Sequence, residues 1–557
     1  MNLPASERDL AALAAALAGP DAPLTRAERT LVRKAPAPSP KHLQQVRRSI
    51  ARGDDPLGSA FCQLRSPEIR REQGAVYTPK PIIDAMIKWA AGEDTPARIV
   101  DPGAGSGRFL FAAASAFPDA ELVAVEIDPL AALMLRANAA ALDMSDRLTL
   151  HLADYRAVDL PEIHGPTLFI GNPPYVRHHD IPADWKDWLA DTAAAYGFKA
   201  SKLAGLHIHF FLKTRQLARP GDYGAFITSA EWLDVNYGDV LRKLLTNGLG
   251  GASLHVIAPA AMPFADAATT GAITCFRVGR RGKGIHFRSV DTLAELDDLQ
   301  DGQPVTWSRL DKARRWSPLL RPATRAPRGY IELGELCRVH RGQVTGCNAV
   351  WIAGAYTGPL PQSVLAPAVT KARELFGAGP RLTSADELRR VIDLPVDLDE
   401  LDATARRQVR RFLRWAKDME ADQSYIASNR RAWWAVNLRD AAPILCTYMA
   451  RRPPAFVRNL CGARHLNIAH GIYPREPLPE SVLDALSAWL NNEVCVSAGR
   501  TYAGGLTKFE PKELERILIP PLEQIHERTE DMDIGGTYSR HRNSQGAVPA
   551  TADGRTA

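Results

Sequence analysis

The sequence has few cysteines and no arrangement of them that predicts a disulfide framework or a zinc site. Its seven cysteines are scattered, odd in number and free of any C-x-x-C pair. We therefore expect reduced thiols, most of them in the core. Two histidine pairs, His178-His179 and His207-x-His209, lack the cysteine and acidic partners of a zinc site. No metal is expected.

Long hydrophobic runs are also missing. The N-terminal stretch MNLPASERDLAALAAALAGP carries Glu7 and Asp9 ahead of a short alanine-rich run. It lacks the basic start of a secretory signal and is too short to span a bilayer. The sequence therefore predicts no targeting segment, no membrane partner and a location in the cytoplasm.

Neither sign of charge dominates. The chain has 69 basic and 63 acidic residues, a formal charge of +6, which is compatible with a polyanionic partner but ordinary for 557 residues. The 45% hydrophobic and 24% charged shares are typical of globular proteins and exclude wholesale disorder or a fibrous repeat. The length exceeds what one hydrophobic core usually holds, so two or three domains are expected.

Changes in composition along the chain predict its division. Short amphipathic helices joined by a proline-rich stretch come first, and the end of the chain is polar without periodic apolar residues. Between them, a stretch rich in Arg, Gly and Pro separates two longer segments. The predicted segments are an N-terminal helical extension (1–70), a first domain (71–290), a linker (291–329), a second domain (330–525) and a disordered tail (526–557).

Apolar runs and helical patterns alternate in the first domain: ARIVDP, GRFLFAAASAF, ELVAVEID, LAALMLRANAAAL. This alternation is typical of βαβ units, so an α/β fold with a doubly wound, Rossmann-like parallel sheet is predicted. The second domain has mixed strand and helix signals and a basic run, RRQVRRFLRW, over 406–415. A mixed α+β structure is expected there.

A glycine loop follows the first predicted strand at Asp101–Gly107, with glycines at 103, 105 and 107. Because a helical pattern follows, the backbone can pass close to a ligand at a helix N-terminus. The next strand ends at Glu126, where a carboxylate can accept hydrogen bonds from ribose hydroxyls. On these two features alone, nicotinamide binding and methyl transfer both remain open.

The motif Gly171-Asn172-Pro173-Pro174-Tyr175 favours methyl transfer over nicotinamide binding, because an oxidoreductase has no use for it. It follows the predicted strand 167–170, at the ligand-binding edge of the sheet. An amine conjugated to an aromatic ring is a poor nucleophile because its lone pair is delocalised. The Asn172 side-chain oxygen and the Pro173 carbonyl can accept from such an amine and localise the lone pair. The prolines Pro173 and Pro174 hold the turn rigid, and Tyr175 offers a face for stacking.

These motifs together resemble the adenine-N6-specific DNA methyltransferases of restriction-modification systems. The resemblance covers about residues 71–280 well. It implies a class I S-adenosylmethionine-dependent catalytic domain over 71–290 and a target-recognition domain over 330–525. It also implies S-adenosyl-L-methionine as cofactor, double-stranded DNA as substrate and a cognate restriction endonuclease as functional partner.

The same resemblance implies further site residues. Asp154 matches the acid that binds the adenine amino group of the cofactor, and Phe210 matches an aromatic residue of the same pocket. Phe264 falls where relatives hold the extruded target base, although no basic residue follows it here. The expected cofactor-binding residues are Tyr77, Thr78, Pro79, Asp101, Gly103, Gly105, Gly107, Glu126, Ile127, Asp154, Tyr155 and Phe210.

Two stretches of the second domain, 334–348 and 500–508, resemble parts of recognition domains in bacterial modification enzymes. Both are rich in Gly, Thr and basic or amide side chains, which can approach phosphates and base edges closely. The target adenine is expected to be flipped from the duplex, because its N6 cannot be reached within the helix.

The same methyl-transfer chemistry also leaves other substrates open. The NPPY motif also serves enzymes that methylate an RNA adenine or a glutamine side chain of release factors, but those chains are usually much shorter. Enzymes acting on cytosine N4 more often carry Ser in place of Asn172. A fused nuclease is disfavoured because residues 1–70 contain no acid-x-Lys pattern, and a non-catalytic DNA-binding protein because the motif is intact.

Overall fold

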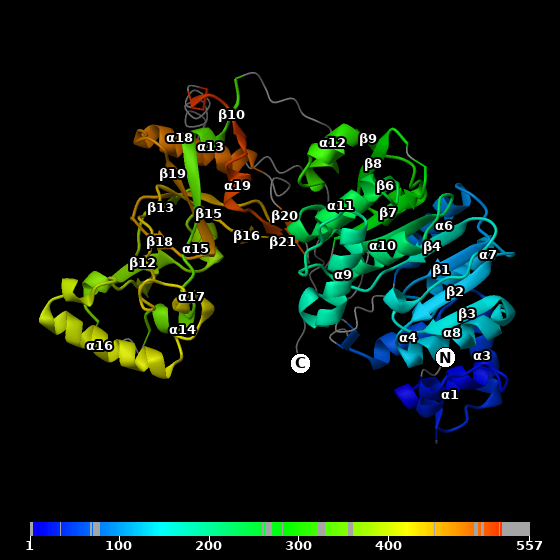
Figure 1. The fold of residues 1–557 in the computed structure, drawn as a ribbon. Coiled ribbons are helices and arrows are strands. Elements are labelled where there is room, and N and C mark those ends of the chain that lie inside the picture. Colours follow the sequence, from blue (N-terminus) through cyan, green and yellow to red (C-terminus); the bar gives the residue numbers. More distant parts are fainter. Residues whose placement is uncertain are drawn as a thin grey trace, which may run out of the picture. The chain divides into compact units, whose positions relative to one another are not determined.

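The chain forms two compact units in the computed structural model (Figure 1): residues 1–325 with 500–507, and 326–499 with 508–557. No helix among the described residues is long and apolar enough to cross a membrane. The structure describes residues 4–33, 35–66, 69–70, 78–258, 261, 270–280, 282–320, 329–354, 360–450, 452–494, 500–502, 506–522 and 524–525.

A nine-stranded sheet is the centre of the first unit. Its strands are β1 (Arg98–Asp101), β2 (Glu121–Glu126), β3 (Leu148–Leu152), β4 (Thr167–Gly171), β5 (Tyr223–Ser229), β6 (Gly251–Ile257), β7 (Gly271–Arg277), β8 (Gly284–Val290) and β9 (Gln303–Thr306). They are ordered β3-β2-β1-β4-β5-β7-β6-β8-β9. The first five are parallel, whereas β7 is antiparallel to both β5 and β6. The carboxyl ends of β1, β2 and β4 therefore meet at one edge, where ligands of open α/β sheets bind.

Helices cover both faces of this sheet (Figure 1). They are α6 (Lys80–Ala91), α7 (Arg108–Ala116), α8 (Pro129–Ala141), α9 (Ala183–Ala195), α10 (Leu206–Leu217) and α11 (Asp239–Thr246). Successive strand residues alternate between two hydrophobic clusters. Ile99 and Leu168 pack with α6, α7 and α8, whereas Val100 and Phe169 pack with α9, α10 and α11. Burial on both faces explains why these strands are almost wholly apolar.

The N-terminal helices form a further layer on α8. They are α1 (Glu7–Ala18), α2 (Arg26–Val32), α3 (Pro40–Ala51) and α4 (Pro56–Leu64). Leu10, Val46 and Phe61 share a hydrophobic cluster with Leu133 and Met134 of α8. Because the opposite side of α8 packs on the sheet, α8 is buried from two sides. The segment 1–70, predicted as an extension, is thus part of the first unit.

The boundary predicted for the first domain differs from the structure. Residues 303–306, placed by the sequence in a linker, form β9, which pairs with β8 and completes the large sheet. The helix α12 (Trp307–Lys312) follows, and Leu310, Trp316 and Leu319 join the core of the first unit. Burial of these apolar side chains holds the segment on the sheet.

The second unit is built on a five-stranded sheet ordered β11-β19-β15-β17-β13, a three-stranded sheet ordered β14-β12-β18, and short strands. The strands of this unit are β10 (Ile331–Glu332), β11 (Cys337–Arg341), β12 (Leu365–Val369), β13 (Arg381–Leu382), β14 (Arg389–Ile392), β15 (Ile444–Thr447), β16 (Met449–Ala450), β17 (Phe456–Asn459), β18 (Arg464–His465), β19 (Ala469–Pro474) and β22 (Leu518–Ile519). The strand β20 (Arg500–Tyr502) and most of β21 (Leu506–Lys508) lie in the segment 500–507, which belongs to the first unit and not, as predicted, to the second domain.

Hydrophobic clusters hold most helices of the second unit in place. Its helices are α13 (Leu333–Leu336), α14 (Asn348–Trp351), α15 (Ala372–Gly377), α16 (Ala403–Asp418), α17 (Tyr425–Ser428), α18 (Glu480–Glu493) and α19 (Pro511–Leu514). Leu486 of α18 packs with Ile444 and Ile472 of the larger sheet. Phe412 of α16 packs with Trp351, and Trp433 lies against the same cluster. The tail 526–557 lies outside the described residues.

Candidate cofactor and catalytic site

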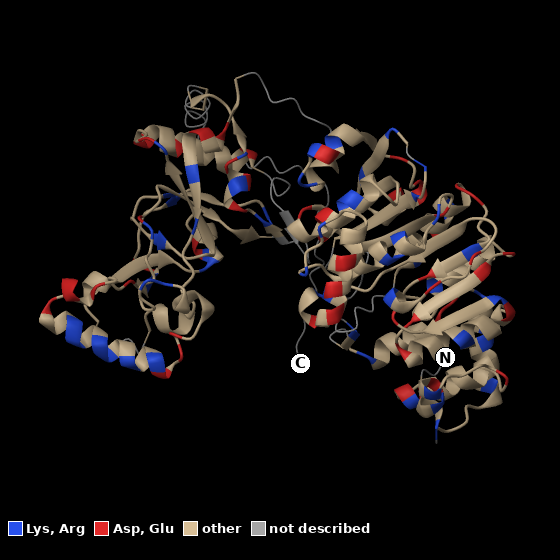
Figure 2. Cartoon of the chain, viewed as in Figure 1, with Lys and Arg blue, Asp and Glu red and all other residues tan. Residues whose placement is uncertain are grey.

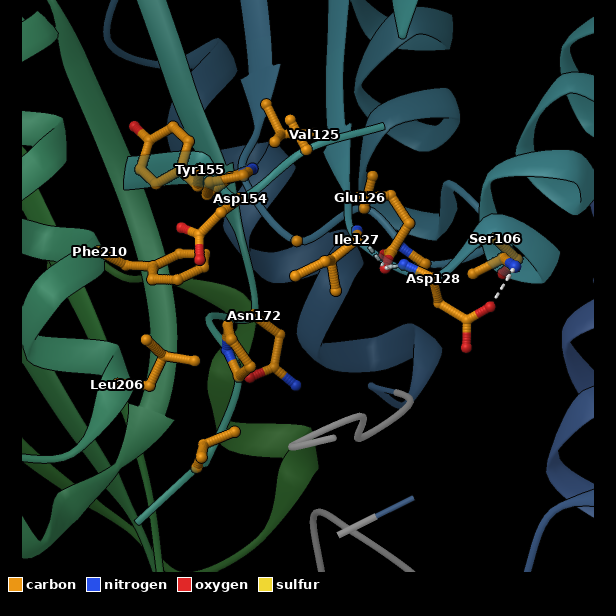
Figure 3. A pocket seen from close by; sticks show the side chains of 18 of the residues that line it. Ser106, Val125, Glu126, Ile127, Asp128, Asp154, Tyr155, Asn172, Leu206 and Phe210 are labelled. Carbon is orange, nitrogen blue, oxygen red and sulfur yellow. Dashed lines mark hydrogen bonds between the residues drawn. The ribbon is translucent and has the colours of Figure 1, made fainter. Parts of the chain in front are cut away.

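A cavity of about 620 Å³ opens at the carboxyl ends of β1, β2 and β4 (Figure 3). Three loops predicted from the sequence contribute to its wall: the glycine loop after β1, the residues after β2, and the turn after β4. Lining residues from these loops include Gly103, Glu126 and Asn172, and α10 adds Phe210. The parallel sheet thus brings together motifs that are far apart in the sequence. The glycine loop and the turn after β4, for example, are about 70 residues apart.

The glycine loop depends on two positive backbone angles. Gly105 has φ +55° and Gly107 has φ +90°, a region that other residues rarely adopt. Gly107 also caps the N-terminus of α7, and a Cβ atom there would lie 2.3 Å from the Phe111 ring. Only glycine therefore lets the chain turn from β1 into α7 at this point.

Glu126 lies at the end of β2 and ties two of the loops together. Its carboxylate accepts hydrogen bonds from the backbone N–H of Gly105 at 2.7 Å, Ile127 at 2.8 Å and Asp128 at 2.9 Å. Burial raises the pKa of Glu126, although these hydrogen bonds oppose the shift. Since each carboxylate oxygen has two lone pairs, the group can still accept from a ligand hydroxyl.

Asp101 is almost completely buried at the end of β1. Its Oδ1 atom accepts a long hydrogen bond of 3.4 Å from Gly103 N–H, and its Oδ2 atom has no hydrogen-bond partner within the described chain. Burial, together with the nearby Glu126 carboxylate, raises the pKa of Asp101 to about 8. Asp101 does not itself line the cavity, although the next two residues, Pro102 and Gly103, do. A positively charged ligand there would favour the carboxylate over the protonated acid.

Two apolar side chains face the cavity from opposite sides (Figure 3). Ile127 is 67% exposed, unusual for its type, whereas Phe210 is held firmly against Tyr155 with ring centroids 5.1 Å apart. The Tyr155 hydroxyl is itself bonded to Thr214 Oγ1 at 3.0 Å, so the ring cannot turn freely. These two side chains give the cavity apolar surfaces that suit a flat aromatic ligand.

Asp154 lies beside Phe210 in the cavity wall (Figure 3). Its carboxylate is held in place by Arg156, a residue that the sequence analysis missed. Arg156 forms a bidentate pair with the Asp154 carboxylate, Nε to Oδ1 at 2.9 Å and Nη2 to Oδ2 at 2.6 Å. Burial opposes ionisation, but the hydrogen bonds from Arg156 outweigh it and lower the pKa of Asp154. The Arg156 guanidinium stacks 4.0 Å from the Trp185 ring and contacts His209 Nδ1 at 3.3 Å.

The turn after β4 places Asn172 in the cavity wall. Its Nδ2 atom donates to Thr78 Oγ1 at 3.1 Å, which links it to the segment before α6. Pro174 also lines the cavity, close to Gly103 of the glycine loop, while Pro173 is buried. The ring of Tyr175 is half-buried against the hydrophobic cluster of α6 and α7 and is not among the lining residues.

The N-terminal helices reach the same loops, a contribution that the sequence analysis did not predict. Asp55, the N-cap of α4, accepts from Ser106 Oγ at 2.6 Å and from Arg108 Nε at 2.7 Å. Arg65 forms an ion pair with Asp128, the N-cap of α8. Two of the three loops that line the cavity, the glycine loop and the residues after β2, are therefore tied to α4 and the residues after it.

Some predicted residues cannot be placed. Tyr77 and Phe264 lie outside the described residues. Thr78 lines the cavity, and Pro79 precedes α6 as its N-cap. Within the described chain, no group of three or more His, Cys, Asp or Glu side chains has the arrangement of a metal site.

Comparison with known proteins identifies the family. Three family models match: "N-6 DNA Methylase" over residues 57–204, "Eco57I restriction-modification methylase" over 164–258, and "Type II methyltransferase M.Eco57I, C-terminal domain" over 323–551. The type II methyltransferase M.XamI of Xanthomonas campestris pv. amaranthicola is 55% identical over 531 residues, which cover 94% of this chain and 99% of M.XamI. The chain belongs to the type II DNA methyltransferases.

More distant relatives agree with this assignment. The type II methyltransferase M.AccI of Acinetobacter calcoaceticus is 23% identical over 86% of this chain and 90% of its own length. The solved structure of the type IIL restriction-modification enzyme MmeI in complex with DNA has the same fold, with a TM-score of 0.52, 14% identity and coverage of 86% of this chain and 75% of that chain.

The comparisons confirm the predicted α/β fold, the class I catalytic domain and S-adenosyl-L-methionine as the methyl donor of this type II methyltransferase. They also confirm methylation of adenine N6 in DNA. A release factor glutamine methyltransferase of Mycolicibacterium smegmatis is 36% identical, but only over 105 residues, or 18% of this chain. The likeness to the glutamine enzymes is thus confined to a short segment.

Proposed function

We propose that this methyltransferase modifies adenine N6 within one short sequence of double-stranded DNA and so protects that sequence from a cognate restriction endonuclease. The proposal is carried by one observation: the NPPY turn and the glycine loop line the same cavity, with Pro174 packed close to Gly103. Since its substrate is cellular DNA, we also propose that the enzyme works in the cytoplasm.

The cavity suits S-adenosyl-L-methionine, which supplies a methyl group on a positively charged sulfonium. In the proposed arrangement, Glu126 accepts hydrogen bonds from the ribose hydroxyls, and Ile127 and Phe210 enclose the adenine ring. Asp154, fixed by Arg156, faces the edge of that ring. The partly satisfied carboxyl of Asp101 offers a negative partner to the positive charge. The glycine loop and Tyr155 complete the binding site.

Asn172 and Pro173 activate the target amine in this proposal. The hydrogen bond from Asn172 Nδ2 to Thr78 Oγ1 sets the plane of the amide, so that its oxygen can accept from the adenine N6 amine. The Pro173 carbonyl accepts the second amine hydrogen. Both acceptors are held before the base arrives, which is the preorganisation that favours catalysis. Tyr175 stacks on the base, and Phe264 helps to hold the extruded base.

The second unit offers groups for sequence recognition. A cavity of about 800 Å³ is lined by Arg338, Arg439 and Arg475, together with the amides of Gln343 and Asn437. Arginine reads guanine, and Gln or Asn reads adenine, through paired hydrogen bonds in the major groove. Asn437 adopts φ +58°, and its carbonyl accepts from Gln343 Nε2 at 2.6 Å. We propose that this cavity belongs to the target-recognition domain.

Single-molecule sequencing of genomic DNA from a methylation-deficient host tests the proposal. Hosts expressing the intact chain should carry N6-methyladenine in one short motif, and hosts expressing Asn172→Ala should not. The purified Asn172→Ala protein should still bind S-adenosylmethionine and DNA, because Asn172 acts on the target amine. DNA carrying the modified motif should resist an endonuclease that cuts the same motif.

Two results would count against the proposal. Unmodified DNA from a host that makes soluble, cofactor-binding protein would direct attention to RNA or protein substrates. Methylation spread over many unrelated motifs would contradict the role of the second unit in recognition.

A further inference from the structure

Basic residues recur along the length of α16 in the second unit (Figure 2). Arg407, Arg410, Arg411, Arg414 and Lys417 are all exposed. Their spacing of three or four residues places them on one side of an α-helix. We call these five residues the α16 basic row.

The opposite face of the helix fixes the row in place. Val409, Phe412 and Ala416 are buried, and the Phe412 ring packs edge-on against Trp351 at 5.8 Å. Asp402 caps the N-terminus of α16 by accepting from the N–H groups of Thr404 and Ala405. The basic side chains therefore project from a rigid, well-anchored helix.

No ion pair recorded among the described residues involves a member of the α16 basic row. Arg406, on the same helix but outside the row, shows the contrast, because it pairs with Asp399 at 2.9 Å. Lys417 lies 5.9 Å from the Trp433 ring, a contact with an aromatic face and not with an acid. Within the described part of the chain, the positive charge of the row is thus not paired with an acidic side chain.

This arrangement works against the stability of the helix. The pairs Arg407–Arg411 and Arg410–Arg414 are like charges four residues apart, which destabilise an α-helix. Local features that oppose folding without a compensating contact are expected at functional sites. A bound polyanion would supply the missing compensation.

We propose that the α16 basic row binds the phosphates of the duplex DNA substrate, independently of its sequence. The row extends from Arg407 to Lys417, a rise of about 15 Å along the helix at 1.5 Å per residue. Duplex DNA carries one negative charge per about 1.7 Å of its axis, so several phosphates lie within that span. Guanidinium groups bind phosphates strongly because their donors match the phosphate oxygens. This inference rests on the proposed role of the second unit in DNA binding.

The salt dependence of DNA binding tests the proposal on the full-length chain. The triple variant Arg407→Gln, Arg411→Gln, Arg414→Gln removes three charges from one face of α16. Each lost phosphate contact lowers the slope of log K against log salt by about 0.9, so the slope should fall by roughly two to three. Affinity for any duplex, with or without the recognition motif, should weaken at least about tenfold at ~0.15 M salt. S-adenosylmethionine affinity and the methylated motif should not change.

A matched triple variant separates this effect from a loss of net charge. Arg47→Gln, Arg48→Gln and Arg52→Gln remove three charges from α3 and the residue after it, in the first unit. The α16 variant should lose much more DNA affinity than the α3 variant, and its slope of log K against log salt should fall further. Its melting temperature should be unchanged or higher, because repulsion within the helix is relieved. Equal slopes for the two variants would overturn the proposal. Failure of the intact chain to methylate DNA in the same assay would instead contradict the proposed function.

Discussion

At the scale of single residues, the site combines groups that the sequence displays together with groups that only folding brings close. The NPPY turn and the glycine loop are contiguous motifs, so they were predicted, and both line the cavity. Their partners are distant in sequence: Thr78 lies 94 residues before Asn172, and Asp55 lies 51 residues before Ser106. Single polar residues far apart carry no pattern, and the sequence analysis missed these contacts.

Asp101 leads to a prediction about pH. Its pKa is raised to about 8, so at pH 6 the carboxyl is mostly protonated in the free protein. The positively charged donor favours the carboxylate, so we expect binding to release a proton below pH 8. Affinity for S-adenosylmethionine should therefore rise with pH from 6 to 8, by up to about tenfold per unit, and level off above. Calorimetry in buffers of different ionisation enthalpy measures both the affinity and the released proton.

The variant Asp101→Asn is the control for this prediction. It cannot titrate, so any pH dependence that remains belongs to the donor itself or to other groups. It should bind more weakly than the intact protein at pH 8 and show a flatter profile. If the affinity of the intact protein and that of Asp101→Asn change with pH in parallel, Asp101 does not titrate in this range.

At the scale of elements, the alternation of apolar runs and helical patterns sufficed to predict the parallel strands and the helices covering them. The pattern failed at the far edge of the sheet. β9 has the sequence QPVT, with one buried side chain, Val305, and so shows too little periodicity to distinguish it from a linker. The N-terminal helices were amphipathic, but nothing in the sequence identified α8 as the surface that covers them.

Contact between α4 and the glycine loop leads to a prediction at this scale. Asp55→Ser keeps a residue that can cap α4 but is too short and neutral to hold both Ser106 and Arg108. Loss of these hydrogen bonds should loosen the glycine loop and weaken S-adenosylmethionine binding about tenfold, or about 1.4 kcal/mol. Fluorescence titration with the cofactor measures the change.

Asp54→Ser is a suitable control, because the Asp54 side chain is bonded to Ser49 and Arg52 on the surface of the N-terminal helices. It should bind the cofactor as the intact protein does. If both variants bind normally, the N-terminal helices support the fold without positioning the cofactor loop.

At the scale of the whole molecule, the proposed function assigns chemistry and recognition to different units. The catalytic cavity is lined entirely by residues of the first unit, and the cavity containing Gln343 and Asn437 entirely by residues of the second. Substitutions in one unit should therefore change one property and leave the other intact. The proposed mechanism needs no metal ion in either unit. The methyl group passes directly from the sulfonium to an amine that hydrogen bonds to Asn172 and Pro173 hold in place.

Gln343→Ala tests this separation. Gln343 lines the second cavity, and its Nε2 atom also supports the Asn437 carbonyl. A lost paired contact to a base costs about 1–3 kcal/mol of discrimination, so one position of the methylated motif should become degenerate. S-adenosylmethionine affinity should be unchanged, and activity on the original motif should persist. Sequencing of genomic DNA from hosts expressing the variant shows the motif directly. A uniform loss of methylation at every site, with the motif unaltered, would mean that Gln343 supports the fold of the second unit and reads no base.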